Sequence, residues 1–285
     1  MKLFRWMTLS RHAQNGTDVE SRRNRALELE REAGRLQSDG KIQRAFDAYD
    51  EAGNIFRELG EHLKASICYS AAATCWNIHT GRHSWTQAAS RDFLAATEAI
   101  KAKQYDYARS LFREAAHLYE REGDTENYSA CFLQSQHAGR QRVYEMWAHG
   151  QAADSFDAST LLNEKAGFLR RVACFIRWLL SLLNDAVWGY GEKPFRTLGV
   201  LVVVLIGCGL AYSLSGCVAT NGEACQLSFW EGLYFSATTL TTVGFGDYLP
   251  TQWTRLLAAA EALSGMALVP IFLVGLTRSH LRMYK

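Results

Sequence analysis

The sequence predicts an all-α protein made of two unlike parts, a solenoid of paired helices followed by a membrane part with two spanning helices. Three observations lead to this fold class. An alanine and aromatic pattern repeats along the first half of the 285 residues, two long apolar stretches occupy the last third, and a glycine-rich heptapeptide lies between them. The overall net charge of +2 and the 48% of hydrophobic residues are averages over a charged first half and an apolar last third.

The repeat in the first half places alanines and large side chains at helical spacing. In its clearest copy Ala45 is followed by Tyr49, Ala52 and Phe56, so the intervals are four, three and four residues. Similar copies begin at Ala65, Ala89 and Ala108, and a weaker copy begins at Ala26. Such positions share one helical face, where the small residues let neighbouring helices approach and the large ones fill the space between them.

Successive copies combine into a two-helix unit that repeats about every 43 to 44 residues, which is typical of an α-solenoid. The pattern resembles the tetratricopeptide superfamily, and the long unit is closer to its SNAP-like relatives than to the shorter form. The resemblance implies a protein or peptide partner for this surface, although the proline of the full signature is missing. We therefore predict a cytoplasmic helical-repeat domain at residues 1–149, with a plain amphipathic bundle as the alternative.

The next segment, residues 150–194, is predicted to be a linker followed by an interfacial amphipathic helix. Residues 150–159 are small and polar, whereas residues 161–187 carry Arg170, Arg171 and Arg177 among large apolar side chains. An arginine at the centre of a spanning helix costs about 2.5–3.5 kcal/mol, so three of them favour a helix on the membrane surface. Gly and Pro residues within 189–194 then interrupt the helix.

Two stretches in the last third are long enough to span a membrane. Residues 195–215 and 256–277 are each apolar apart from one charged residue. The length of each stretch is close to the roughly 20 residues that a helix needs to cross a bilayer. The apolar stretch 229–240 is too short to span and suits a re-entrant helix surrounded by protein. Residues 195–285 thus form a predicted transmembrane domain.

The basic residues predict the orientation of this domain. No Lys or Arg occurs from Thr197 to Thr254, whereas five precede the first span within residues 170–196 and more follow the second, up to Lys285. The positive-inside rule then places both termini in the cytoplasm of a multi-pass protein of the cell membrane. Acidic residues between the spans would attract cations to the outer face; they are Glu223, Glu231 and Asp247.

The heptapeptide at residues 241–247 reads Thr-Thr-Val-Gly-Phe-Gly-Asp. Its alternating glycines permit backbone conformations in which successive carbonyls point to one side, and rings of carbonyls replace the hydration shell of an ion in potassium channels. The segment resembles the potassium-channel pore family, with Phe in place of the usual Tyr. The resemblance implies a homotetramer in the lipid bilayer, potassium as the permeant ion and no cofactor. The implied selectivity filter is Thr242, Val243, Gly244, Phe245 and Gly246, with the potassium ions at the first four of these.

The same resemblance implies roles for residues around the filter. Tyr234 and Phe235 take the place of the aromatic pair that packs around it, and Thr238 stands where many relatives have a Glu that bonds to the Asp after the filter, here Asp247. Because Phe245 has no hydroxyl group and Thr238 no carboxyl group, we expect a filter held more by packing than by hydrogen bonds.

Farther along the second span, Gly265 lies where relatives place a hinge glycine. Pro270 is expected to kink the same helix, and bending at these two residues would open and close the gate. A packing role alone for the proline is the alternative.

The remaining patterns mostly exclude functions. Seven cysteines show no zinc-binding spacing. Cys217 and Cys225 share the outer loop, and either a disulfide or two free thiols fits the sequence there. No catalytic grouping or phosphate-binding loop is present, so we expect no enzymatic activity and no nucleic-acid partner.

The sequence therefore predicts a potassium-selective channel subunit that the repeat domain regulates. The alternatives are a membrane-anchored helical-repeat scaffold that carries no current and a less selective cation channel.

Overall fold

The computed structural model describes residues 2–78, 84–149, 168–220 and 223–282. The chain divides into two compact units, Met1–Leu179 and Leu180–Lys285. The predicted linker at residues 150–159, the first residues of the predicted amphipathic helix (161–167) and Lys285 lie outside the described residues.

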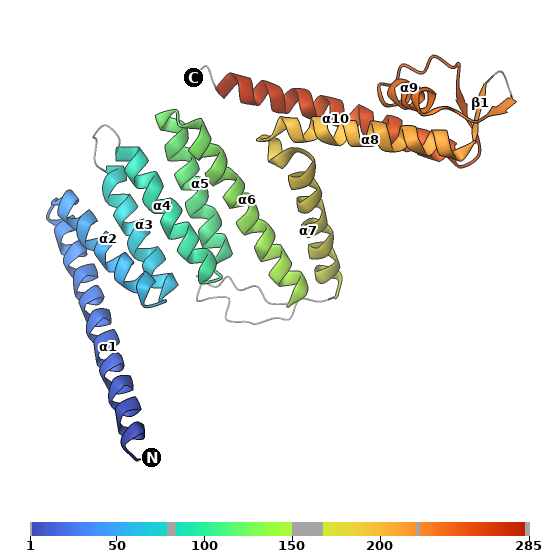
Figure 1. Ribbon diagram of the computed structural model, residues 1–285. Helices are drawn as coiled ribbons and strands as arrows, with labels where there is room; N and C mark the ends of the chain where they lie inside the picture. Colours follow the sequence, from blue (N-terminus) through green and yellow to red (C-terminus); the bar gives the residue numbers. More distant parts are fainter. Residues whose placement is uncertain (1, 79–83, 150–167, 221–222, 283–285) are drawn as a thin grey trace. The chain divides into compact units, whose positions relative to one another are not determined.

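The first unit is a row of helices in which each helix packs beside the next one along the chain (Figure 1). The predicted solenoid of paired helices is thus confirmed. The helices of the row are α1 (Lys2–Ser38), α2 (Ile42–Glu58), α3 (His62–Ile78), α4 (Ser84–Lys101), α5 (Tyr105–Glu122) and α6 (Thr125–Ala148). A seventh helix, α7 (Phe168–Trp188), begins in this unit and ends in the second.

The core of the first unit lies at the predicted repeat positions. Every alanine of the pattern is 0% exposed; these are Ala26, Ala33, Ala45, Ala52, Ala65, Ala72, Ala89, Ala96, Ala108 and Ala115. The aromatic positions Phe56, Tyr69 and Phe112 are 0%, 0% and 2% exposed and share one cluster that spans several helices. Small and large residues therefore alternate at the helix contacts, as close packing requires.

Glycines with positive φ end several helices of the row. Gly123 has a φ of 79° after α5, and the next amide, that of Asp124, donates to the Tyr119 carbonyl at 3.0 Å. Glycine suits this left-handed position because it has no Cβ. The Asp124 side chain then accepts from the Asn127 amide at 3.0 Å and caps the start of α6.

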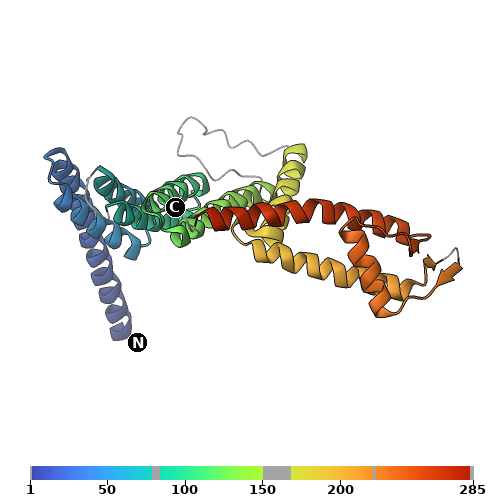
Figure 2. The ribbon, with the colours of Figure 1, turned by 90° about the horizontal axis from the view of Figure 1, so that it is seen from above.

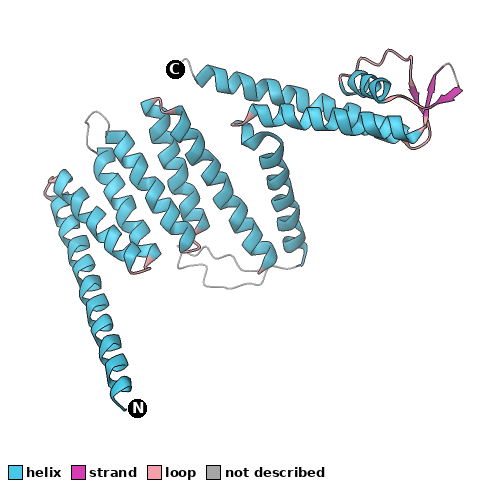
Figure 3. Cartoon of the chain, in the orientation of Figure 1, coloured by secondary structure: helices cyan, strands magenta, loops and turns pink. Residues whose placement is uncertain are grey.

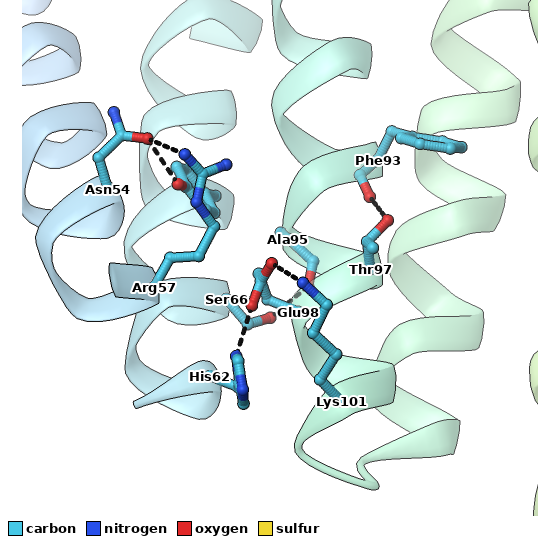
Figure 4. Close-up of polar contacts among 10 residues, drawn as sticks. Asn54, Arg57, His62, Ser66, Phe93, Ala95, Thr97, Glu98 and Lys101 are labelled. Carbon is cyan, nitrogen blue, oxygen red and sulfur yellow. Dashed lines mark hydrogen bonds and ion pairs between the residues drawn. The ribbon is translucent and has the colours of Figure 1, made fainter. Parts of the chain in front are cut away.

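Buried polar side chains also join α3 to α4 (Figure 4). The Glu98 carboxylate is 3% exposed and lies 2.7 Å from both His62 Nδ1 and Lys101 Nζ. Burial alone would raise the pKa of Glu98, but the hydrogen bonds from Lys101 and His62 hold it below the usual value. Nearby, the Ser66 hydroxyl donates to the Ala95 carbonyl at 2.7 Å. The two helices are thus fixed by polar contacts as well as by packing.

The second unit contains two long helices and one short one. They are α8 (Pro194–Ser215), α9 (Phe229–Leu240) and α10 (Thr254–Arg282). Figures 1 and 2 together show α8 and α10 running alongside each other, with α9 at the end that carries the strands. A 3-10 turn, η1 (Gly189–Gly191), precedes α8, and Pro194 occupies the first turn of α8, where its missing N–H costs no hydrogen bond. The helical structure is therefore interrupted at residues 189–194, as the Gly and Pro residues there predict.

A small sheet beside α9 is an addition to the predicted all-α fold (Figure 3). Strand β1 (Val218–Thr220) pairs antiparallel with β2 (Glu223–Cys225) and with β3 (Leu249–Pro250). The strand β3 follows the heptapeptide, so the sheet ties the segment after the heptapeptide to the segment after α8. Strands of two or three residues are too short to show a period in the sequence.

Three of the described helices are long and apolar enough to cross a membrane: residues 171–191, 194–215 and 254–277. The second and third coincide with the predicted spans. The first is most of α7, for which we predicted a place on the membrane surface. In the first unit, Trp147 of α6 stacks on Trp178 of α7 at 5.7 Å, and Arg171 Nε donates to the Trp147 carbonyl at 3.1 Å. These contacts tie the first half of α7 to a repeat helix, and the place of α7 on the membrane surface stays a prediction.

Candidate functional site

The short helix α9 begins with a well-formed cap. The Ser228 amide donates to the Glu231 carboxylate at 2.7 Å, and the Ser228 hydroxyl accepts from the Glu231 amide at 3.4 Å. This capping box fixes the first turn of the helix. The hydrogen bond from the Ser228 amide lowers the pKa of Glu231, so its charge is kept at the end of α9 where acidic groups are favourable.

The chain leaves α9 in a tight turn that leads into the heptapeptide. The Thr238 carbonyl accepts from the amides of Val243 at 2.9 Å and Gly244 at 3.2 Å. The segment is therefore attached to the last turn of the helix by main-chain hydrogen bonds, and the position of α9 decides where the segment begins.

Residues with positive φ alternate along the heptapeptide. Thr242, Gly244 and Gly246 have φ values of 58°, 52° and 82°, whereas Val243 and Phe245 do not. In an ordinary strand successive carbonyls point to opposite sides, and a change in the sign of φ at every second residue turns them toward the same side. A β-branched residue such as Thr242 rarely takes a positive φ, and such strain tends to gather at functional sites.

All residues from Thr241 to Asp247 are exposed in the single chain. Val243 and Phe245 are 55% and 71% exposed, although both side chains are apolar. Among the described residues, nothing lies within 4 Å of a Cβ added at Gly244 or Gly246. One subunit thus leaves this segment uncovered, and apolar side chains of this size are normally covered by protein or lipid.

Aromatic side chains support the segment from the side of α9. The Tyr234 ring lies parallel to the Phe245 ring at 6.5 Å, and Phe235 packs edge-on against Tyr212 at 4.7 Å. Both predicted aromatic residues are therefore next to the heptapeptide or to its supporting helices. Tyr248, which follows the heptapeptide, contacts both of them through its ring.

The hydrogen bonds around Asp247 agree with the expectation for Thr238 and add a partner that the sequence did not suggest. Thr238 does not reach Asp247, because its hydroxyl donates to the Phe235 carbonyl at 3.0 Å. Asp247 nevertheless has a partner, since the Tyr234 hydroxyl hydrogen-bonds to it, which raises the pKa of Tyr234. Tyr248 likewise hydrogen-bonds to Glu231. The segment after the filter residues is therefore held by tyrosine hydroxyls from the neighbouring sequence, a feature that the family register did not reveal.

The two predicted hinge residues have different surroundings. Gly265 faces the end of α9, and a Cβ added there would collide with the Leu240 carbonyl oxygen. Pro270 lies inside the continuous helix α10 and is exposed. Gly265 is thus a point of close contact between two helices, and Pro270 is the residue that removes a hydrogen bond from the α10 backbone.

Cys217 and Cys225 are not bonded to each other in the structure. Cys217 Sγ donates to Gln252 Oε1 at 3.5 Å, and Cys225 Sγ lies 3.3 Å from the Thr220 hydroxyl. Within the described residues no group of three or more His, Cys, Asp or Glu side chains is arranged to hold a metal ion.

Sequence comparison matches each unit to a different family. Residues 199–279 match an ion-channel family, and residues 22–175, more than half of the chain, match the soluble NSF attachment protein (SNAP) family. The chain belongs to the SNAP family through its helical repeats, and residues 199–279, which follow them, are similar to the ion-channel family. It is accordingly a membrane protein, and these families give it neither an enzymatic activity nor a cofactor.

Curated relatives share the channel part only. Two pore potassium channel b of Oryza sativa subsp. japonica is 36% identical over 92 residues, which are 30% of this chain and 24% of the relative. Two pore potassium channel a of the same plant is 34% identical over 82 residues, 28% of this chain and 23% of the relative. Potassium channel subfamily K member 2 of Homo sapiens is 32% identical over 62 residues, 22% of this chain and 14% of the relative. The chain spans less than a quarter of each relative's length, and no solved structure matches it.

Proposed function

We propose that the chain is a subunit of a potassium-selective channel with its filter at residues 242–246. The observation that carries the proposal is the alternation of φ along this segment, between two helices that are long enough to span a membrane. The curated relatives named as potassium channels support the choice of ion. The carbonyls of Thr242, Val243, Gly244 and Phe245 and the Thr242 hydroxyl would replace the water around potassium.

Four copies would form the pore. One chain contributes one such segment, and a ring of carbonyls requires several segments around an axis. The exposed apolar side chains of the segment support assembly, because neighbouring subunits would cover them. With the positive-inside rule, the filter opens outward and both termini are cytoplasmic. In this arrangement residues 1–149 form the repeat domain, residues 150–194 the connection and residues 195–285 the pore domain.

The test is ion flux through the purified full-length chain in liposomes. We expect potassium flux well above sodium flux, and Gly207→Ala, a change in an open part of α8, should behave like the wild type. Equal fluxes of the two ions would favour a less selective cation channel. No flux from a correctly assembled protein would favour a membrane-anchored scaffold and would refute the proposal.

The repeat domain would regulate opening by binding a protein or peptide partner. Solenoids present extended surfaces, and the SNAP family is named for attachment to another protein. Regulation requires a difference in partner affinity between the closed and open states, typically about 1–3 kcal/mol. Deletion of residues 1–157 tests the idea. A truncated channel that assembles and gates like the full-length chain under all conditions would reduce the domain to a scaffold.

A further inference from the structure

A buried carboxyl group lies inside the membrane part of the second unit. Glu261 of α10 is 2% exposed and interrupts a stretch that is otherwise apolar. A carboxyl group in such surroundings is costly unless polar partners satisfy it, and ionisable residues within membrane helices usually have a function. The question is therefore what Glu261 contacts.

The partners of Glu261 come from both other helices of the unit. The Tyr212 hydroxyl of α8 donates to Glu261 Oε2 at 2.7 Å, and the Ser236 hydroxyl of α9 contacts Glu261 Oε1. Tyr212 and Ser236 are both 0% exposed. A third contact comes from the Cys208 thiol, one helical turn before Tyr212. One carboxyl group thus joins α8, α9 and α10 in a site closed to water.

The helices approach one another closely on both sides of this carboxyl group. A Cβ added to Gly232 of α9 would collide with the Gly209 carbonyl oxygen of α8, and one added to Gly265 of α10 would collide with the Leu240 carbonyl oxygen of α9. Gly232, Ser236 and Leu240 follow each other at four-residue intervals, so they form one face of α9. The short helix is therefore fixed along its whole length between the two long ones.

The face of α9 that packs against α8 and α10 is close along the chain to the proposed filter. Ser236 lies two residues before Thr238, whose carbonyl accepts the amides of Val243 at 2.9 Å and Gly244 at 3.2 Å. The Ser236 hydroxyl also lies 3.0 Å from the Leu205 carbonyl of α8. A shift or rotation of α9 would break these contacts and move the start of the filter segment with them.

We propose that Glu261 is a positioning residue of the filter. Glu261 holds α9 between α8 and α10, and it thereby places the Thr238 carbonyl where this group accepts hydrogen bonds from the Val243 and Gly244 amides. The inference rests on the proposed function, in which residues 242–246 conduct potassium. It also changes the expected mode of support, because the base of the filter is then anchored by a buried polar group in addition to aromatic packing.

Two substitutions separate hydrogen bonding from volume. In Glu261→Gln the amide oxygen can accept from Tyr212 and the amide nitrogen can donate to Ser236, while Ser236 donates to the Leu205 carbonyl. Glu261→Leu keeps a similar volume but leaves the Tyr212 hydroxyl without its acceptor. The control is Ser264→Ala, since the Ser264 hydroxyl donates to the main-chain carbonyl of Glu261 at 2.7 Å and leaves the hydrogen bonds of the Glu261 carboxyl group unchanged.

The first measurement is the ratio of potassium to sodium flux in liposomes, at high and at low external potassium. We expect Glu261→Gln and Ser264→Ala to resemble the wild type. Glu261→Leu should lose about tenfold in the flux ratio at low potassium, because an unsatisfied buried hydroxyl displaces the helix. Wild-type behaviour of Glu261→Leu in this assay would overturn the inference.

The second measurement does not depend on conduction. Amide hydrogen exchange at Val243 and Gly244 reports directly on the bonds to the Thr238 carbonyl, and it should become faster in Glu261→Leu and stay unchanged in Glu261→Gln. If the wild type carries no potassium while exchange still responds to Glu261→Leu, the proposed function fails and the positioning role stands. If the wild type is selective and neither measurement responds, the positioning role fails alone.

A further variant allows the test to be made even if Glu261→Leu does not fold. Tyr212→Phe keeps the ring that packs on Phe235 and removes only the hydroxyl that donates to Glu261. It should shift both measurements in the same direction as Glu261→Leu, by a smaller factor. If Glu261→Leu does not assemble, Tyr212→Phe decides between the two outcomes, and unchanged selectivity and exchange in this variant would refute the role.

Discussion

The two units of the chain bury their large side chains to very different extents. In the repeat unit Phe56 and Tyr69 are 0% exposed and Phe112 is 2% exposed, so this unit completes its core from its own helices. In the pore unit Leu256, Trp230 and Phe245 are 78%, 74% and 71% exposed. Apolar surface of this kind requires lipid or other protein to cover it. The first unit thus completes its core from its own helices, whereas the second leaves large apolar side chains for lipid or other protein to cover.

The use of glycine differs in the same way. In the repeat unit Gly40, Gly60 and Gly123 end helices at positive φ, with open space where a side chain would lie. In the pore unit Gly232 and Gly265 allow contact between helix backbones, and Gly244 and Gly246 shape the filter segment. Substitutions at glycine should therefore be far more damaging in the second unit.

The largest effect is expected from Gly244→Ala in the proposed filter. The φ of 52° at this position disfavours any residue with a Cβ, by about 1–2 kcal/mol in each of four strands. Potassium flux should disappear while the protein still assembles, which flux measurement and native mass determination would show. Gly207→Ala, in a helical part of α8 with no atom within 4 Å of the new Cβ among the described residues, is the matched control. Normal potassium selectivity in Gly244→Ala would exclude this segment as the filter.

The second largest effect is expected in the packed core of the repeat unit. Phe112→Ala should destabilise this unit by about 3–5 kcal/mol, since it removes a fully packed ring. Amide hydrogen exchange of helix α5 in the full-length chain would measure the loss. Val19→Ala, at a residue that is 50% exposed, should change the same exchange by less than about 0.5 kcal/mol. If potassium selectivity fell together with the stability of α5, the proposed filter would depend on the core of the repeat unit as well.

The repeat unit was also the easier one to predict from sequence. Its alanines and aromatics recur at helical spacing, and the contacts they make lie between neighbouring helices, so periodicity alone identifies the core. The heptapeptide resembles the potassium-channel pore family through the order of its residues, and its alternating φ follows from its glycines except at Thr242.

The sequence did not reveal the contacts that join distant parts of the pore unit. Glu261 was visible as an interruption of an apolar stretch, but its bond to Tyr212 joins residues 49 positions apart. Gly265 lay at the expected hinge position, yet only the packing against Leu240 shows that it is a contact point. Such features depend on how three helices cross, which a periodic pattern does not encode.

A third prediction uses a buried carboxyl group of the repeat unit. Asp92 is 4% exposed, and burial together with the nearby Glu114 raises its pKa from 3.8 to about 8. The folded state therefore keeps a proton that the unfolded state releases above about pH 4. The free energy of unfolding should be greatest in acid and should fall as the pH rises toward about 8, by at most about 1.4 kcal/mol per pH unit.

Chemical denaturation followed by exchange in α4, at several pH values between 5 and 8, would check this dependence. Asp92→Asn carries a neutral amide and should remove most of the slope, whereas Asp18→Asn, at an exposed carboxylate, should keep it. Glu98 does not interfere, because its lowered pKa confines its contribution to more acidic solutions. A slope that persists in Asp92→Asn would assign the effect to another group.

The smallest effect is expected at Pro270, and it concerns the way in which the pore unit moves. Proline has no N–H, so the carbonyl of Met266 lacks its usual partner within α10, and the helix is weaker there. Pro270→Ala restores this bond and should make bending harder, which would change the open probability a few-fold while the ion selectivity stays the same. Single-channel recording in planar bilayers measures both quantities. Gly265→Ala is a poor test of bending, since its Cβ would strike the Leu240 carbonyl and disturb the filter as well. Leu276→Ala, at a half-exposed residue of the same helix, is the control. An unchanged open probability in Pro270→Ala would leave the proline with a packing role only, and the motion of the pore unit would then have to arise elsewhere.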